Sequence, residues 1–317
     1  MPYERRPYGS QWIEPMPRIP EIILNSTVYL YPDVEDAQCG SEIGGSGFLF
    51  GWPSQSGCSK AVHCYAITCR HVVLGGSPVV RVNLRDRSSG YEKTFSMDFS
   101  KDDWVCHSDQ DIAVCPLPPD AKMELWDASC IGPDFVLTLD QFREMQVGPG
   151  DDLVYIGRFM SHAGKYQNMP SVRFGNISMN PCEEEPIEYE DPETGERKSQ
   201  VGFLVEARSR SGYSGSPVFL INEINKSNKR WLMPMFGELR LLGIDFAHIP
   251  EKITLSNPEG SVKWQAEVHA GMMGVIPSWH ILEFINTSPR LIEQRRRDDE
   301  IYAAWHPNAV LDTNTGV

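Results

Sequence analysis

Short runs of apolar and β-branched residues recur along the chain, and turn-forming residues separate them. In the first third such runs occur at 21–30, 48–50, 62–68, 79–84 and 91–97, with Gly, Pro, Ser or Asp between them. No helical pattern of about 10 to 15 residues intervenes, as a parallel sheet built from βαβ units would require. The pattern therefore predicts an antiparallel sheet that closes as a barrel or a sandwich.

A second series of strand-like runs follows a segment of different character. The run Asp111–Leu117 ends the first series, and residues 118–144 are rich in prolines and acids, with one helical pattern at 139–144. Strand-like runs then return at 148–157, 171–177, 201–205, 218–221, 231–236, 241–248 and 270–276. At 278–285 the period becomes helical, and Ser278 is placed where a residue can cap the helix.

These patterns divide the chain into five parts. We expect an N-terminal arm over residues 1–20, a first β block over 21–120, a linker over 121–147, a second β block over 148–277, and a C-terminal helix and tail over 278–317.

The segment from Cys182 to Gln200 is densely acidic. Pro192 and Gly195 stand where a turn favours them, between the strand-like runs 187–189 and 201–205, so we interpret the segment as a protruding hairpin. It is either a solvated surface loop or a flap that regulates the protein or recruits its substrate.

Charge and targeting signals narrow the partners. The chain has 317 residues and a formal net charge of -14, which argues against nucleic acid or an anionic membrane, because phosphate binding requires excess Lys and Arg. The first residues include two arginines but no apolar stretch after them, and no window approaches about 18 uncharged apolar residues. We therefore expect a cytoplasmic protein.

The cysteines do not form a metal-binding pattern. Eight cysteines are present and no CxxC pair occurs, so we expect free thiols and neither a metal nor another cofactor. In an oxidising compartment, a disulfide among Cys39, Cys58, Cys64 and Cys69 stays an alternative.

Three short stretches supply residue types that nucleophilic catalysis needs. Ser214 stands between glycines just before an apolar strand, where a side chain can be presented to a ligand. A serine hydroxyl needs a base, and His71, directly after an apolar strand, is the strongest candidate. Asp111, at the start of another buried strand, is the carboxylate that could orient the base.

Together and in this order, the stretches resemble a known family. Thr-x-x-His-Val at 68–72, Asp-Ile-Ala-Val at 111–114 and Gly-x-Ser-Gly-x-Pro at 212–217 resemble the three motifs of chymotrypsin-like (trypsin-fold) serine endopeptidases. The resemblance covers about residues 22–287 and is to the bacterial intracellular type. It implies an all-β fold of two packed six-stranded antiparallel barrels, with the site between them.

The resemblance also assigns roles. Ser214 would attack a peptide carbonyl, His71 would transfer the proton, Asp111 would orient His71, and the main-chain N–H groups of Gly212 and Ser214 would bind the oxyanion. Tyr213 stands where the digestive enzymes have an aspartate that pairs with a newly cut N-terminus, so we expect no activation by that route.

Substrate specificity is less determined by the resemblance. The pocket floor would be Arg208, which would attract an acidic P1 residue. The strand that forms the pocket wall would contain Asp245, Phe246, Ala247 and His248. Within it, Asp245 would attract a basic P1 residue. The strand residue is positioned more reliably than the loop residue, which favours basic P1.

Two other functions fit parts of this sequence. Residues 212–216 nearly match the nucleophile turn of α/β-hydrolases, but Pro217 and the apolar run after it favour a strand where that fold needs a helix. The larger alternative is a trypsin-fold domain that binds a partner without cutting it. We expect a dedicated regulatory or defence protease with a protein substrate and an activator or regulatory protein, because an unrestrained cytoplasmic protease would be hazardous.

Overall fold

The computed structural model describes residues 19–42, 44–56, 61–85, 93–191, 195–207, 212–221, 239–256 and 263–305. Most of the expected arm, the expected strand at 231–236 and Arg208 lie outside these ranges. No helix among the described residues is long and apolar enough to cross a membrane.

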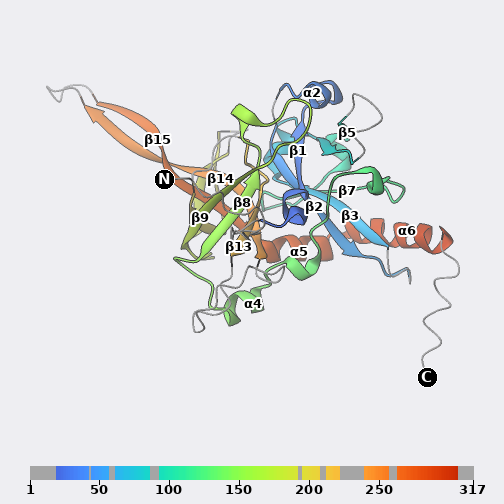
Figure 1. Cartoon of the computed structure of the whole chain (residues 1–317). Coiled ribbons are helices and arrows are strands. Elements are labelled where there is room, and N and C mark those ends of the chain that lie inside the picture. Colours follow the sequence, from blue (N-terminus) through green and yellow to red (C-terminus); the bar gives the residue numbers. More distant parts are fainter. Residues whose placement is uncertain are drawn as a thin grey trace, which may run out of the picture.

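Strands make up most of the regular structure (Figure 1). In the first block they are β1 Thr27–Tyr31, β2 Ser46–Pro53, β3 Val62–Thr68, β4 Val79–Asn83, β5 Thr94–Met97, β6 Val105–Cys106 and β7 Ala113–Pro116. In the second block they are β8 Asp152–Gly157, β9 Ser171–Met179, β10 Ile187–Glu190, β11 Arg197–Gln200, β12 Phe203–Glu206, β13 Pro217–Ile221, β14 Leu239–Ser256 and β15 Lys263–Pro277.

The helices are short except at the C-terminal end. They are α1 Glu21–Leu24, α2 Val34–Cys39, α3 Arg70–Leu74, α4 Leu139–Glu144, α5 Ser278–Thr287 and α6 Pro289–Trp305, with 3-10 turns η1 Lys101–Asp103, η2 Met123–Leu125, η3 Pro133–Phe135 and η4 Met160–His162.

The second block is a closed six-stranded barrel in the order β12-β15-β14-β13-β8-β9. Every neighbouring pair is antiparallel. This confirms the expected barrel for this half of the chain.

The first block forms one antiparallel sheet of seven strands, in the order β5-β4-β1-β2-β3-β7-β6. Its outer strands, β5 and β6, are not paired with each other among the described strands. The antiparallel sheet predicted for this block is confirmed, with one strand more than the six expected and with two edges.

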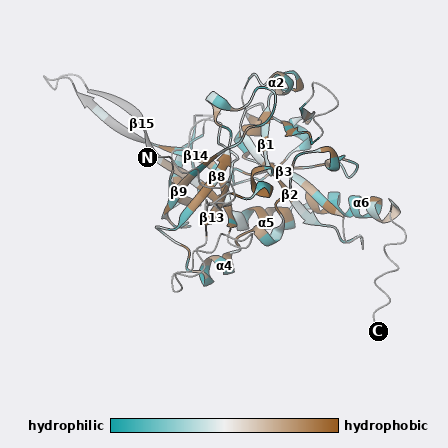
Figure 2. Cartoon of the chain, viewed as in Figure 1, coloured by the Kyte–Doolittle hydropathy of each residue, from teal (hydrophilic) through white to brown (hydrophobic). Residues whose placement is uncertain are grey.

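One hydrophobic core joins the two blocks. Phe48 and Ile67 of the first sheet, Ile156 and Phe219 of the barrel and Ile281 of α5 belong to one cluster of buried residues. A separate cluster, which contains Tyr155, Phe203, Val218 and Leu242, also involves strands of the barrel. In Figure 2 hydrophobic residues are concentrated on β8 and α5, whereas α6 is mostly hydrophilic. Burying a side chain of this size contributes about 1.5 to 3 kcal/mol, so the shared cluster holds the two blocks together.

The start of the predicted strand at 21–30 is wrong, because Glu21–Leu24 is the helical turn α1 and the strand begins at Thr27. Pro20 precedes the turn with φ -56°, and the acidic Glu21 lies in its first turn. Both features favour the start of a helix. The sequence analysis missed this signal because the apolar residues that follow have strand-like composition.

Two C-terminal elements are longer than the sequence patterns indicated. Strands β14 and β15 continue past the barrel as a two-stranded arm, with Ser256 paired to Lys263 (Figure 1). The available signal was the turn-forming run Asn-Pro-Glu-Gly at 257–260. Ser278 does not cap α5; it is the first residue of the helix, and its Oγ donates to Leu137 O at 2.8 Å.

The mixed-charge run 294–300 lies in α6, a helix the sequence analysis did not predict. Arg296 pairs with Glu293 and Glu300 along its exposed face, at the spacing that stabilises helices. Another acidic residue of the helix, Asp299, lies with its Oδ1 3.0 Å from His63 Nε2 of β3. Polar contacts therefore help to hold α6 against the first block, although the helix has few apolar residues that would indicate a buried face.

Candidate active site

His71 and Asp111 form a close acid–base pair. His71 Nδ1 lies 2.6 Å from Asp111 Oδ2, and the backbone N of His71 donates to Asp111 Oδ1 at 2.9 Å. The Asp111 side chain is 4% exposed and that of His71 13% exposed. An ionised carboxylate can only accept, so Nδ1 carries the proton of the bond and Nε2 is left as the basic nitrogen.

Strand register brings this pair together. Thr68, at the end of β3, pairs with Ala113 at the start of β7. His71 follows Thr68 by three residues and Asp111 precedes Ala113 by two, so both emerge at the same end of the sheet. Helix α3 then turns the chain so that the backbone of His71 also faces the carboxylate.

The backbone of Asp111 is held by a residue from the second half of the chain. Gln200 Oε1 accepts a hydrogen bond from Asp111 N at 3.2 Å, and Gln200 is buried. Gln200 ends β11, so the acidic hairpin reaches the His71–Asp111 pair. The hairpin exists as predicted, but its second strand is 197–200, and the run at 203–206 belongs to the barrel.

The hairpin also contacts the predicted substrate-binding strand. Tyr189 of β10 packs edge-on against Phe246 of β14, with ring centroids 5.1 Å apart. Burial raises the pKa of Tyr189, and the nearby carboxylates of Asp111 and Asp191 raise it further, so the phenol is neutral at pH 7. The inner face of the hairpin therefore packs beside the site, which an entirely protruding hairpin would not do.

Ser214 lies in a tight loop that Ser46 organises. Ser46 N donates to Ser214 O at 2.9 Å, and Ser46 Oγ donates to Gly212 O at 2.7 Å. The same Oγ accepts a hydrogen bond from Arg158 N at 2.9 Å. Gly212 has φ +95°, a conformation that glycine adopts without strain. One serine of the first block thus fixes the backbone on both sides of Tyr213.

The carbonyl of Asp245 connects the Ser214 loop with the strand that leads to His71. Gly215 N donates to Asp245 O at 2.8 Å, and Cys69 Sγ donates to the same oxygen at 3.1 Å. Gly215 follows Ser214 directly, and Cys69 precedes His71 by two residues. This shared acceptor places the predicted nucleophile and the predicted base on adjoining segments.

The groups that would act on a substrate have no partner among the described residues. Ser214 is partly exposed, and its hydroxyl makes no hydrogen bond within the described part of the chain. The backbone N–H groups of Gly212 and Ser214 likewise donate to no described residue. Among the described residues, therefore, the ring of His71 is hydrogen-bonded to Asp111 and not to the Ser214 hydroxyl.

The residues predicted to bind substrate lie on β14, apart from Arg208, which lies outside the described residues. Asp245 and Phe246 are each 1% exposed, Ala247 is partly exposed and His248 is exposed. The register with β15 shifts between Asp245 and Ala247, which leaves Phe246 as an extra residue. Basic P1 specificity stays a prediction.

Tyr213 points into the barrel. Its side chain is fully buried, its ring lies edge-on to Tyr155 at 5.4 Å, and its hydroxyl contacts Ser171 and accepts from Arg173 Nε at 2.8 Å. Its contacts thus come from strands of the barrel itself. Activation without a newly cut N-terminus stays a prediction.

Cys69 lies close to the acid–base pair. Ligand atoms of Cys69, His71 and Asp111 lie within 4.8 Å of one another. Burial raises the pKa of the Cys69 thiol well above its usual range, and Asp111 and Asp245 raise it further. In this arrangement the Cys69 thiol donates to the Asp245 carbonyl.

The structure adds residues that the sequence analysis did not select. Ser46 and Gln200 position the predicted site, and Tyr189 packs against the strand predicted to bind substrate. Ser46 had one signal, the glycine-rich run at 44–47, which indicated close backbone approach.

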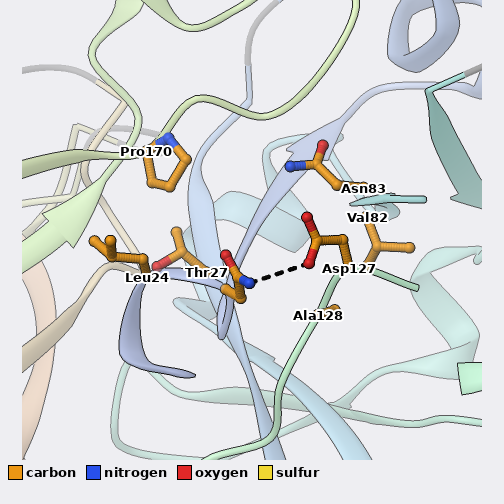
Figure 3. A pocket seen from close by; sticks show the side chains of 8 residues that line it. Leu24, Thr27, Val82, Asn83, Asp127, Ala128 and Pro170 are labelled. Atoms are coloured by element: carbon orange, nitrogen blue, oxygen red, sulfur yellow. Dashed lines mark hydrogen bonds between the residues drawn. The ribbon is translucent and has the colours of Figure 1, made fainter. Parts of the chain in front are cut away.

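A small polar pocket lies elsewhere on the first block (Figure 3). It is lined by Leu24, Asn25, Thr27, Val82, Asn83, Asp127, Ala128 and Pro170, and Asn25 Nδ2 donates to Asp127 Oδ1 at 3.2 Å. Its volume of about 20 Å³ suits about one water molecule. None of the candidate catalytic residues lines it.

No family model and no curated protein sequence matches the chain. Among solved structures, one titled "atomic resolution structure of HBP" is similar, with 9% sequence identity and a TM-score of 0.44. The match covers 85% of this chain and 93% of that one.

Proposed function

We propose that this protein is a trypsin-like serine endopeptidase in which Ser214 is the nucleophile, His71 the general base and Asp111 the residue that orients the base. The observation that carries the proposal is the shared Asp245 carbonyl, which accepts from Gly215 N and Cys69 Sγ and so joins the Ser214 loop to the strand before His71. The His71 to Asp111 distance of 2.6 Å supports the assignment of the base.

The mechanism follows from the hydrogen bonds of the pair. Asp111 holds the Nδ1–H of His71, so Nε2 takes the proton from Ser214 as its oxygen attacks the peptide carbonyl. The N–H groups of Gly212 and Ser214 stabilise the negative charge that develops on the carbonyl oxygen. His71 then gives the proton to the departing amine, and water hydrolyses the acyl-enzyme by the same steps in reverse.

The two blocks correspond, in our proposal, to the two barrels of the trypsin fold. We propose that the seven-stranded sheet is the counterpart of the first barrel of the trypsin fold, and that the closed barrel is the second. The order His71, Asp111, Ser214 along the chain and the cluster of buried residues shared by both blocks support it. In this arrangement the first block supplies base and acid, and the second supplies the nucleophile.

We propose that the protein acts in the cytoplasm on a dedicated protein substrate, as a regulatory or defence protease. The hairpin β10–β11 supports restraint of activity, because Gln200 touches Asp111 and Tyr189 touches Phe246. A partner that engages its acidic outer face would act on residues next to the catalytic pair.

A fluorophosphonate probe tests the proposal, because it reacts with an activated serine and not with a surface hydroxyl. We expect labelling of wild-type protein at Ser214, and its loss in Ser214→Ala and His71→Ala. Removing a member of such a triad lowers kcat by about 10³ to 10⁶. Ser216→Ala is the matched control, since Ser216 is two residues away and fully buried, and it should retain labelling. Folded wild-type protein that remains unlabelled would instead favour the non-enzymatic binding domain.

A further inference from the structure

Two cysteines that are distant in sequence meet between β3 and the segment that joins the two blocks. Cys64 lies on β3 and Cys130 lies between η2 and η3. Their sulfur atoms are 3.0 Å apart, across a sequence separation of 66 residues. In the part of the chain that the structure describes, no other two sulfurs are in hydrogen-bond contact.

Backbone hydrogen bonds fix Cys130 in this place. Ile131 N donates to Leu49 O at 2.9 Å and Gly51 N donates to Ile131 O at 2.9 Å, so the segment runs parallel to β2. The position of Cys130 is therefore set by its neighbour in the chain and does not depend on the thiol contact.

Gly51 provides the space for the two sulfurs. It is directly opposite Cys64 in the β2–β3 register, and side chains of such a pair lie on the same face of the sheet. A Cβ on Gly51 would lie 3.1 Å from Cys130 Cβ, which is tighter than ordinary contact. Cys130 thus occupies the place that a side chain at Gly51 would take, beside Cys64.

The two thiols differ in access. Cys64 is 6% exposed, whereas Cys130 is partly exposed, so a small oxidant reaches Cys130 first. The hydrogen bond with Cys130 and burial raise the pKa of Cys64.

We propose that Cys64 and Cys130 are a redox pair that closes to an intramolecular disulfide when a peroxide oxidises the protein. The Cys130 sulfur attacks one peroxide oxygen, the O–O bond breaks, and one water leaves as Cys130 becomes a sulfenic acid. The Cys64 sulfur then attacks the Cys130 sulfur, and the S–O bond breaks as a second water leaves with the proton of Cys64. Two thiols and one hydrogen peroxide thus give one disulfide and two waters.

Little movement is needed, because a disulfide bond is about 2.05 Å long and the sulfurs need to approach by only about 1 Å. The bond would tie the joining segment to β3, the strand whose end leads to His71. Closing a long loop restricts the unfolded chain, so oxidation should raise the Tm by on the order of 5 °C. The proposal does not depend on the proposed protease activity.

The test uses the full chain with Cys39→Ser and Cys182→Ser, because both of these thiols are exposed and would form links between molecules. After treatment with hydrogen peroxide, non-reducing peptide mapping should find Cys64 linked to Cys130, and the Tm should rise and return with dithiothreitol. Cys130→Ser in this background should lose both responses. Cys115→Ser removes a different buried thiol, one that donates to the carbonyl of Pro116, and this variant should keep both the link and the rise in Tm.

Two outcomes would overturn the pairing. They are a link from Cys64 to Cys58 and conversion of Cys130 to a sulfinic acid without a link. If Cys130→Ser fails to fold, the peptide map of the parent protein still decides which cysteines are linked.

Discussion

The contact between the Ser214 loop and the first block can be tested by Gly215→Ala. Gly215 has φ +88°, and a Cβ there would lie 2.0 Å from the carbonyl oxygen of Ser46 and 2.3 Å from Thr68 Oγ1. The nearer atom is backbone, so the clash cannot be relieved by rotating a side chain. Alanine would force the loop away from the residues that hold Ser214.

The expected loss of stability in Gly215→Ala has two parts, backbone strain and steric overlap, and a substitution at a second glycine separates them. Gly150 has φ +97° in the turn before β8, with nothing within 4 Å of its would-be Cβ. The left-handed backbone costs about 1 to 2 kcal/mol at either position, and overpacking adds about 1 to 3 kcal/mol at Gly215 alone. We expect Gly150→Ala to lower the free energy of unfolding by about 1 to 2 kcal/mol and Gly215→Ala by about 2 to 5 kcal/mol.

Urea unfolding of both variants measures the difference, and the rate of fluorophosphonate labelling reports the position of Ser214. Gly215→Ala should slow labelling strongly, whereas Gly150→Ala should react like wild type. Equal losses of stability, with labelling unaffected in both variants, would refute the placement of this loop against Ser46 and Thr68.

Two further substitutions test the surroundings of the acid–base pair. Gln200→Ala leaves the buried N–H of Asp111 without its acceptor, so it should lower the free energy of unfolding by about 1 to 2 kcal/mol and slow the labelling of Ser214. If urea unfolding and the labelling rate were both unchanged, the contact between Gln200 and Asp111 would be contradicted. His107→Asn tests pH dependence: burial lowers the pKa of His107, whose Nδ1 accepts from the backbone of Asp109 and Gln110. The stability that neutral His107 provides is complete above its unfolded pKa of about 6.5 and is lost as the pH falls through the lower pKa of the folded state. The wild-type protein should therefore become less stable between pH 7.5 and 5. The asparagine variant keeps a hydrogen-bond acceptor at this position and does not titrate, so it should lose less stability. Identical pH slopes in urea unfolding would refute this.

The sequence was sufficient to predict much of the strand content because apolar runs bounded by turn residues are local signals. Helix α4 and strand β3 coincide with predicted segments, and β8 lies within one. The sequence analysis also placed His71 and Asp111 at the correct ends of their strands, since a polar residue beside an apolar run is visible without knowing the fold. How the strands of the first block pair depends on register between distant segments, and no local pattern contains it.

The supports of the site could not be predicted for the same reason. Ser46 Oγ and its acceptor Gly212 O are separated by 166 residues, and Asp111 N and Gln200 Oε1 by 89. Cys64 and Cys130 meet only because Ile131 pairs with β2. A serine, a glutamine and a cysteine are each ordinary in composition, and their roles arise from three-dimensional neighbours.

The acidic hairpin shows how overall charge can hide a buried face. Its composition predicts exposure, yet β10 alternates partly buried Ile187 and Tyr189 with exposed Glu188 and Glu190. Side chains on one face of an antiparallel pair are neighbours, and Ile187 is directly opposite Gln200. The two apolar positions therefore orient the hairpin so that Glu188 and Glu190 face solvent and Gln200 lies against Asp111 on the inner face. Period-two alternation is the signal that predicts the buried face of the hairpin, and it is independent of the net charge of the segment.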